Sequence, residues 1–205
     1  MEISSPGQTA DEPARPRFTR LAEVISEIAG PAPLLLIGLL QVGLPSGAVA
    51  ATIVSVVTMA ILPYASTIWL ARAGRLSGRF VSNRRQRIPI LLGTLVVVVV
   101  GAVVTALIGA PRPLLALAVL AVVTLAVVSI VTLRWKLSIH ATLAVFFAGL
   151  QVCLYGAIGL VSLVIPAAVV WARFHLRAHT LGELAAGAAL GAAMSIVYAL
   201  AITAA

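Results

Sequence analysis

The sequence predicts an all-α fold, a polytopic bundle of six or seven transmembrane helices. Hydrophobic residues make up 61% of the 205 residues and charged residues only 10%. The mean hydropathy is +1.14. Soluble domains usually carry about 25% charged residues. The uncharged runs are also long enough to supply the roughly 20 apolar residues that one helix needs to cross a bilayer.

The first two uncharged runs each predict a pair of spans. Residues 28–71 carry no charge and are interrupted by the segment LPSG at Leu44–Gly47, which predicts a shorter span followed by a longer one. Residues 88–133 carry only Arg112, which lies in the turn-like segment GAPRP at Gly109–Pro113. This second run therefore predicts two spans joined by a turn.

The last two runs complete the bundle. Residues 141–171 are uncharged and punctuated by YGAIG at Tyr155–Gly159, so they predict a hairpin of two short helices. Residues 184–205 form the final span. The total is six spans, or seven if the proline-containing first segment crosses fully. The polar residues 1–27 are expected to form a flexible tail before a membrane domain at residues 28–205.

The net charge of +8 indicates membrane topology rather than binding to nucleic acid. If seven helices cross, all basic segments fall on one face and only Arg112 falls on the other. The positive-inside rule then predicts that the basic face is cytoplasmic in a multi-pass protein of the cell membrane. The basic residues are Arg15, Arg17 and Arg20 in the tail, those within residues 72–87, Arg134 with Lys136, and Arg173 with Arg177.

Beyond the tail, the ionisable residues collect in three islands, at residues 79–89, 134–141 and 173–187. Ionisable groups at membrane level are costly and usually serve a function. Two crossings separate each island from the next, so all three return to the same side of the membrane. The islands are therefore expected to converge on one site.

Arginines, histidines and one carboxylate suit the recognition of a phosphate dianion. Glu183 follows His179 by four residues, which places both on one face of a helix. A carboxylate there can accept the Nδ1 proton of His179 and leave Nε2 as a nucleophile. His140, four residues after Lys136 at the start of another span, can supply a proton to a leaving group.

The third island resembles a motif of the type 2 phosphatidic acid phosphatase superfamily, Arg-x5-His-x3-Asp, with Arg173, His179 and Glu183 at the three positions. The segment SIHA at residues 138–141 is similar to the family's second motif, Ser-Gly-His. The segment NRRQRIP at residues 83–89 is similar to its basic first motif, and the order along the chain agrees. The resemblance implies a membrane phosphatase that acts on lipid or prenyl phosphates without a metal or cofactor.

The resemblance also implies a role for each matched residue. His179 would form a phosphohistidine, Glu183 would orient its ring, and His140 would act as general acid. The phosphoryl oxygens would be held by Arg173, Arg87, Arg84 and Ser138. Arg79 is the second choice to Arg84 for the place of the family's lysine. Lys136 is interpreted either as a phosphate ligand or as a topological anchor.

Two other functions are compatible with the same residues. His175, His179 and Glu183 are spaced i, i+4 and i+8, so a continuous helix would align three metal ligands. A non-enzymatic protein that binds or transports anions is the second alternative. His175 and Arg177 are otherwise interpreted as interfacial residues, and Gly187 with Gly191 as a small-residue face that another helix approaches closely. The sequence leaves the lipid tail, the choice of monophosphate or diphosphate and the oligomeric state open.

Overall fold

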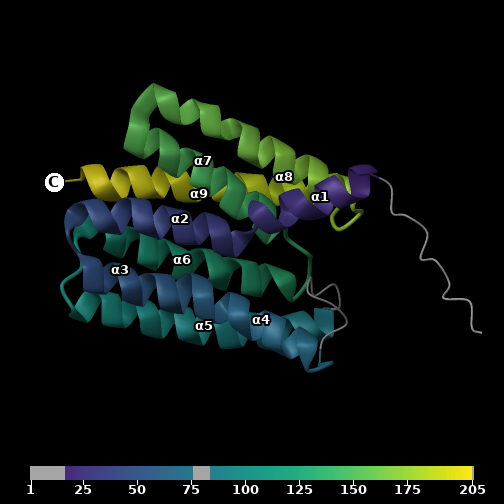
Figure 1. The fold of residues 1–205 in the computed structure, drawn as a ribbon, viewed down its shortest axis with the longest axis horizontal. Helices are drawn as coiled ribbons and strands as arrows, with labels where there is room; N and C mark the ends of the chain where they lie inside the picture. Colours follow the sequence, from purple (N-terminus) through teal and green to yellow (C-terminus); the bar gives the residue numbers. More distant parts are fainter. Residues whose placement is uncertain (1–16, 76–83, 205) are drawn as a thin grey trace, which may run out of the picture.

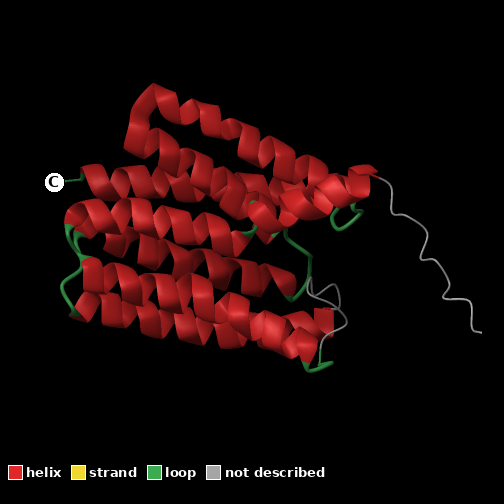
Figure 2. Cartoon of the chain, viewed as in Figure 1, coloured by secondary structure: helices red, strands yellow, loops and turns green. Residues whose placement is uncertain are grey.

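A computed structural model describes residues 17–75 and 84–204 of the chain. These residues form an all-helical bundle without a strand among them, and most helices run along one common axis (Figures 1 and 2). Six helical segments are long and apolar enough to cross a membrane. The predicted fold, a polytopic bundle of transmembrane helices, is confirmed.

The helices follow one another with short connections. In chain order they are α1 (Arg17–Ile28), α2 (Pro31–Gly43), the 3-10 turn η1 (Leu44–Ser46), α3 (Val49–Val56), the π-helical turn η2 (Val57–Ile61), α4 (Leu62–Arg72), α5 (Arg84–Leu107), α6 (Arg112–Thr132), α7 (Ile139–Tyr155), the 3-10 segment η3 (Gly156–Leu163), α8 (Val164–His175) and α9 (Leu181–Thr203). The LPSG and GAPRP segments separate spans as predicted. Gly47 and Gly109 both adopt the positive φ, +72° and +74°, that a residue without Cβ tolerates.

The stretch from α7 to α8 folds back on itself as the predicted hairpin (Figure 1). The chain turns at Gly156, whose φ is +60°. Gly159 then lies so close to the backbone of Gln151 that a Cβ atom would clash there. The Ser162 hydroxyl donates a hydrogen bond of 3.4 Å to the carbonyl of Ala148 across the hairpin. The two arms therefore cross the bundle separately, although they form one hydropathic stretch.

Part of the predicted N-terminal tail is helical. Residues 17–27 form most of α1, which packs against α8, so they are not a flexible extension. The apolar run therefore begins at the end of a helix, and Gly30 with Pro31 separates α1 from α2. The helix was not predicted because α1 contains charged residues and the spans were predicted from uncharged runs. Residues 1–16, assigned to the same tail, lie outside the described residues.

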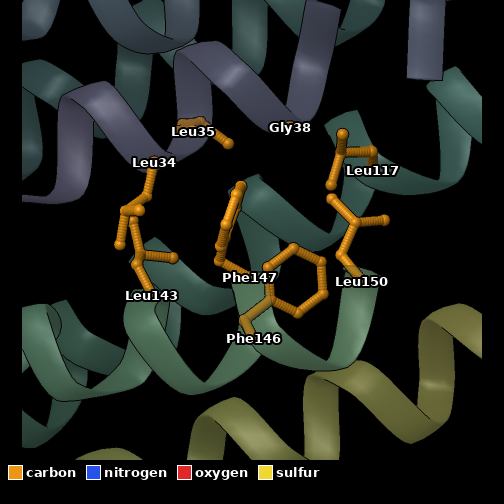
Figure 3. A pocket seen from close by; sticks show the side chains of 8 residues that line it. All are labelled: Leu34, Leu35, Gly38, Leu117, Leu143, Phe146, Phe147 and Leu150. Atoms are coloured by element: carbon orange, nitrogen blue, oxygen red, sulfur yellow. The ribbon is translucent and has the colours of Figure 1, made fainter. Parts of the chain in front are cut away.

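The core of the bundle is apolar and tightly packed. Its completely buried side chains include Leu39, Leu114, Leu117, Leu150 and Tyr198. A small cavity of about 10 Å³ remains between α2, α6 and α7 (Figure 3). It is lined only by leucine, phenylalanine and glycine, and a volume of this size holds at most about one water molecule. The middle of the bundle therefore offers no binding site there.

Two pairs of polar side chains join helices within the bundle. Gln41 of α2 and Gln151 of α7 exchange amide hydrogen bonds of 3.3 and 2.8 Å. The hydroxyls of Ser55 and Thr105 lie 2.9 Å apart in the buried contact between α3 and α5. In the apolar interior of a membrane protein such pairs join helices without leaving a polar group unsatisfied.

The direction of each helix places the polar islands at one end of the bundle. The C-terminal ends of α4, α6 and α8 lie at the same end as the N-terminal ends of α5, α7 and α9 (Figure 1). Arg112 begins α6 at the opposite end. Residues 134–141 and 173–187 meet directly, because α7 packs along α9. Of the island at residues 79–89, the first five residues lie outside the described residues.

Candidate functional site

The site is organised around a contact between His179 and Glu183. The Nδ1 atom of His179 lies 3.0 Å from Oε2 of Glu183. His179 is buried, with 8% of its surface exposed. The spacing of four residues predicted this contact. The hydrogen bond is consistent with the tautomer that carries the proton on Nδ1, in which Nε2 has a free lone pair.

Glu183 also starts helix α9. Its Oε2 accepts a hydrogen bond of 3.0 Å from the amide of Thr180, and the Thr180 hydroxyl accepts one of 3.3 Å from the amide of Glu183. This reciprocal pair is a capping box with Thr180 as N-cap. His179 therefore stands one residue before the cap, and the same carboxylate fixes both the imidazole and the start of the helix.

Helix α8 ends just before the site in a Schellman motif. The amide of Arg177 donates to the carbonyl of Phe174, and the amide of Ala178 donates to the carbonyl of Arg173. Arg177 adopts a left-handed backbone with φ +51°. The helical path is interrupted here, so the continuous helix that the metal alternative requires does not form. Among residues 17–75 and 84–204, no three His, Cys, Asp or Glu side chains lie close enough to hold a metal ion together.

Helices α7 and α9 are locked together beside the catalytic candidates. The amide of Ser138, the N-cap of α7, donates a hydrogen bond of 3.3 Å to the carbonyl of Glu183. One turn further along α9, a Cβ on Gly187 would lie 2.5 Å from the carbonyl oxygen of Ser138. A Cβ on Gly191 would likewise collide with the carbonyl of Thr142. The close helix approach predicted from the two glycines is present, and it holds the second island against the third.

Lys136 ties the second island to the loop that carries His179. Its Nζ atom donates a hydrogen bond of 2.6 Å to the backbone carbonyl of Ala178. Ala178 directly precedes His179, so this contact restrains the backbone beside the imidazole. The ammonium group also brings a positive charge to the site.

The electrostatic setting keeps His179 neutral near pH 7. Burial lowers its pKa from 6.5 to about 4, and the positive charges of Lys136 and Arg173 contribute to the decrease. The Glu183 carboxylate acts in the opposite direction, through its hydrogen bond and its charge. Arg173 is itself buried, with 6% of its surface exposed. A neutral imidazole next to fixed positive charges is suited to attack an anionic phosphorus centre.

An open hollow of about 1290 Å³ lies over this pair. Pockets for small ligands commonly measure about 300–1,000 Å³, so the hollow can hold more than a phosphate group. It is lined by Lys136, Trp171, Phe174, His175, Arg177, Ala178, His179, Thr180, Leu181, Gly182 and Glu183. Its wall thus combines cationic groups with exposed apolar side chains, and Trp171 stacks on His175 with ring centroids 5.3 Å apart.

The predicted site residues divide into three groups. His179, Glu183 and Lys136 line the hollow. Arg173, Ser138 and His140 are buried near it without lining it. Arg84 and Arg87 lie in the first turn of α5, which packs against α3 and α6, and their side chains are outside the described part of the structure. Arg79 is also outside the described residues.

Sequence reasoning missed three residues of the site. Thr180 was not assigned a role, although Thr-x-x-Glu before an apolar run is the usual pattern of a capping box. Arg177 was interpreted as an interfacial anchor. Its position on the hollow depends on its left-handed backbone, which the sequence does not predict because no glycine marks that position. His175, which was likewise assigned to the interface, also lines the hollow.

No protein-family model matches this chain, and no curated protein or solved structure matches it either.

Proposed function

We propose that this protein is an integral membrane phosphatase that hydrolyses a lipid or polyprenyl (di)phosphate through a covalent phosphohistidine on His179. The observation that carries the proposal is the 3.0 Å contact between Nδ1 of His179 and Oε2 of Glu183 at the wall of a cationic hollow. A histidine oriented by a carboxylate, with its second nitrogen available, is the arrangement that nucleophilic catalysis requires.

In the first step, Nε2 of His179 attacks the phosphorus atom, an N–P bond forms and the bond between phosphorus and the leaving oxygen breaks. The ring becomes positively charged, and the Glu183 carboxylate stabilises that charge. Arg173 and Lys136 add positive potential that favours the phosphoryl oxygens. Under this proposal Ser138 supports the same oxygens, and Arg84 or Arg87 completes the phosphate ligands.

In the second step, water attacks the phosphohistidine, the N–P bond breaks and inorganic phosphate leaves. His140 is the proposed proton donor to the leaving group and the proposed base for this water. The reaction needs no metal or other cofactor, because the histidine supplies the nucleophile and the basic residues supply the positive charge.

A substrate anchored in the membrane fits the position of the hollow. The hollow lies at one end of a transmembrane bundle, where α8 ends and α9 begins. Trp171, Phe174 and Leu181 give it exposed apolar surface. A lipid tail in the bilayer can therefore present its phosphate to His179 at the membrane surface.

We place the protein in the cell membrane with this end in the cytoplasm. The described basic residues outside α6 lie on the segments that meet at the site end, whereas Arg112 begins α6 at the other end. The positive-inside rule favours a cytoplasmic position for the basic end. This orientation implies that the substrate is a lipid phosphate of the inner leaflet.

The decisive experiment is a phosphate-release assay in detergent with prenyl, polyprenyl-sugar and glycerolipid phosphates. The wild-type protein is expected to release phosphate from at least one of them in the presence of a strong chelator. His179→Ala should abolish release. The covalent intermediate is trapped by quenching at alkaline pH, because phosphohistidine is acid-labile. Arg134→Gln, at an exposed position that does not line the hollow, should retain the activity.

The proposal fails if the wild-type protein releases no phosphate from any of these lipids, or if His179→Ala remains equally active. Binding of the phosphate group without release would instead support the alternative, a non-enzymatic protein that binds or transports anions.

A further inference from the structure

Arg177 occupies a backbone conformation that disfavours its side chain. Five residues in the described part of the chain have positive φ, and four of them are glycines: Gly47, Gly74, Gly109 and Gly156. Arg177, with φ +51°, is the fifth. It takes the position after a helix end where glycine is usual, because a Cβ atom is crowded in the left-handed region. Among the described residues, Arg177 beside the hollow is the only residue with positive φ that is not a glycine.

Arg177 lies beside the proposed nucleophile. Its side chain is exposed and lines the same hollow as His179. Arg177 precedes His179 by two residues, so both are contributed to the hollow by the same short connection between α8 and α9. Backbone strain that persists at a ligand-binding surface points to a role for the side chain that the backbone holds there.

The hollow has the charge and size for a second anionic group. Lys136 lines it together with Arg177. Glu183 is the one carboxylate among the described residues that line it, and it is hydrogen-bonded to His179 and Thr180. The volume of about 1290 Å³ leaves room beyond the phosphoryl group that His179 would take. A guanidinium binds phosphate oxygens through two parallel hydrogen bonds and keeps its charge at any pH used for catalysis.

The chemistry of the leaving group points the same way. A monophosphate ester must expel an alkoxide, which needs a proton. A diphosphate expels a phosphate, which leaves as an anion and needs only a positive charge beside it. Arg177 can supply that charge but cannot supply a proton.

We propose that Arg177 is a specificity residue that binds the lipid-linked phosphate of a diphosphate substrate, so that the site favours lipid diphosphates over monophosphates. The inference rests on the proposed function. Nε2 of His179 attacks the terminal phosphorus, the N–P bond forms, and the bridging P–O bond breaks. Its electron pair stays on the lipid monophosphate, whose charge Arg177 offsets. Water then releases inorganic phosphate and restores the imidazole.

The test compares kcat/KM for a prenyl diphosphate and the monophosphate of the same prenyl chain, in detergent. Arg177→Gly is the principal variant, because glycine relieves the left-handed backbone and the variant is expected to fold at least as well as the wild type. Arg177→Gln removes the charge and keeps a side chain. Arg134→Gln is the matched control, since Arg134 is exposed in the neighbouring connection and does not line the hollow.

Both Arg177 variants are expected to lower kcat/KM for the diphosphate by about 10- to 100-fold, the loss of a charge-assisted hydrogen-bonded contact. Their kcat/KM for the monophosphate should stay within about threefold, and Arg134→Gln should change neither. An equal fall for both substrates, an unchanged diphosphate value, or the same fall in Arg134→Gln would overturn the inference while leaving the phosphatase intact.

A second experiment tests whether Arg177 binds the substrate phosphate or an anionic lipid headgroup. The assay is repeated in micelles with zwitterionic lipid alone and with added anionic glycerolipid. The diphosphate-specific loss should be the same in both. A loss that appears only with anionic lipid would identify Arg177 as a headgroup anchor and overturn the inference. A wild-type protein that hydrolyses neither substrate would overturn the proposed function together with the inference.

Discussion

Oε2 of Glu183 lies 3.0 Å from Nδ1 of His179, and the same oxygen accepts the amide of Thr180 at 3.0 Å. One carboxylate oxygen thus orients the proposed nucleophile and closes the capping box of α9. The start of α9 and the orientation of the imidazole therefore depend on the same carboxylate. Substitutions at position 183 that keep the cap should therefore affect catalysis alone, whereas those that lose the cap should also affect stability.

Glu183→Gln should separate catalysis from stability. Glutamine also serves at the third position of a capping box, and its carbonyl oxygen can accept the same two hydrogen bonds. It lacks the negative charge that stabilises a charged ring, so we expect phosphate release to fall by about 100-fold or more with little change in Tm. Glu183→Ala should lose activity and also about 1 kcal/mol of stability through the missing cap. Full activity of Glu183→Gln would show that the charge has no catalytic role.

The pH profile should report the neutral form of His179. Its pKa of about 4 predicts that kcat/KM falls as pH decreases through about 4, because the protonated ring cannot attack phosphorus. Lys136→Gln removes a positive charge that lowers this pKa, so the acid limb should move to higher pH. Lys136→Arg keeps the charge and is the control. An acid limb that stays in place in Lys136→Gln would contradict the electrostatic account.

The same ionisation affects stability. The pKa of His179 is lower in the folded protein than its ordinary value of 6.5, so between pH 6.5 and about 4 the unfolded chain binds more protons. Stability therefore decreases as pH falls through this interval and is unaffected by His179 above it. Thermal unfolding in detergent should show this decrease in the wild type and a smaller one in His179→Ala. Equal pH dependence in the two proteins would mean that other groups cause it.

The fold was predictable because few arrangements are possible for so apolar a chain. Charge-free runs and the Gly/Pro punctuation at Gly47, Gly109 and Gly156 gave the spans and the hairpin. Helix α1 was missed, because its Arg20, Glu23 and Glu27 resemble a polar tail when the sequence is searched for uncharged runs. Its packing against α8 is a tertiary contact, which no local pattern contains.

The candidate site was predictable where spacing is local. The contact between His179 and Glu183 follows from a separation of four residues. The contact of Lys136 with Ala178 joins residues 42 positions apart and depends on how closely α7 and α9 approach. The exposure of Arg177 depends on the left-handed turn that ends α8. Long-range packing and an unexpected backbone conformation therefore account for what sequence reasoning did not find.

Gly187 should be essential for the approach of α9 to α7. In Gly187→Ala the new Cβ would lie 2.5 Å from the Ser138 carbonyl oxygen, a backbone atom that can move only with its helix. We expect a loss of about 1–3 kcal/mol in stability and a fall in activity, because the contact between Ser138 and Glu183 must open. Gly182→Ala is the matched control for stability on the same helix, since its Cβ meets only Trp135, at 3.8 Å. Thermal unfolding and phosphate release measure both effects.

The Gln41–Gln151 pair should stabilise the bundle without affecting the site. Gln151→Leu removes both hydrogen bonds between the two amides, leaves Gln41 with only its 3.5 Å contact to the Tyr155 hydroxyl, and should cost about 1 kcal/mol. The double variant Gln41→Leu with Gln151→Leu should recover part of this loss, because no unpaired amide remains. Phosphate release per folded protein should be unchanged throughout. If the losses of the single variants Gln41→Leu and Gln151→Leu add up exactly to the loss of the double variant, the two amides do not interact.

The orientation of the bundle can be tested with two cysteines placed at its opposite ends. Cys153 is the chain's one cysteine, so Cys153→Ala provides a clean background. Arg134→Cys lies in the exposed connection at the site end, and Ser46→Cys lies in the exposed turn η1 at the other end. If the basic end is cytoplasmic, a membrane-impermeant reagent added to intact cells should label position 46 and should reach position 134 only after permeabilisation. The opposite pattern would place His179 outside the cytoplasm. The substrate would then be a lipid phosphate of the outer leaflet, because its phosphate must lie on the same side as the hollow.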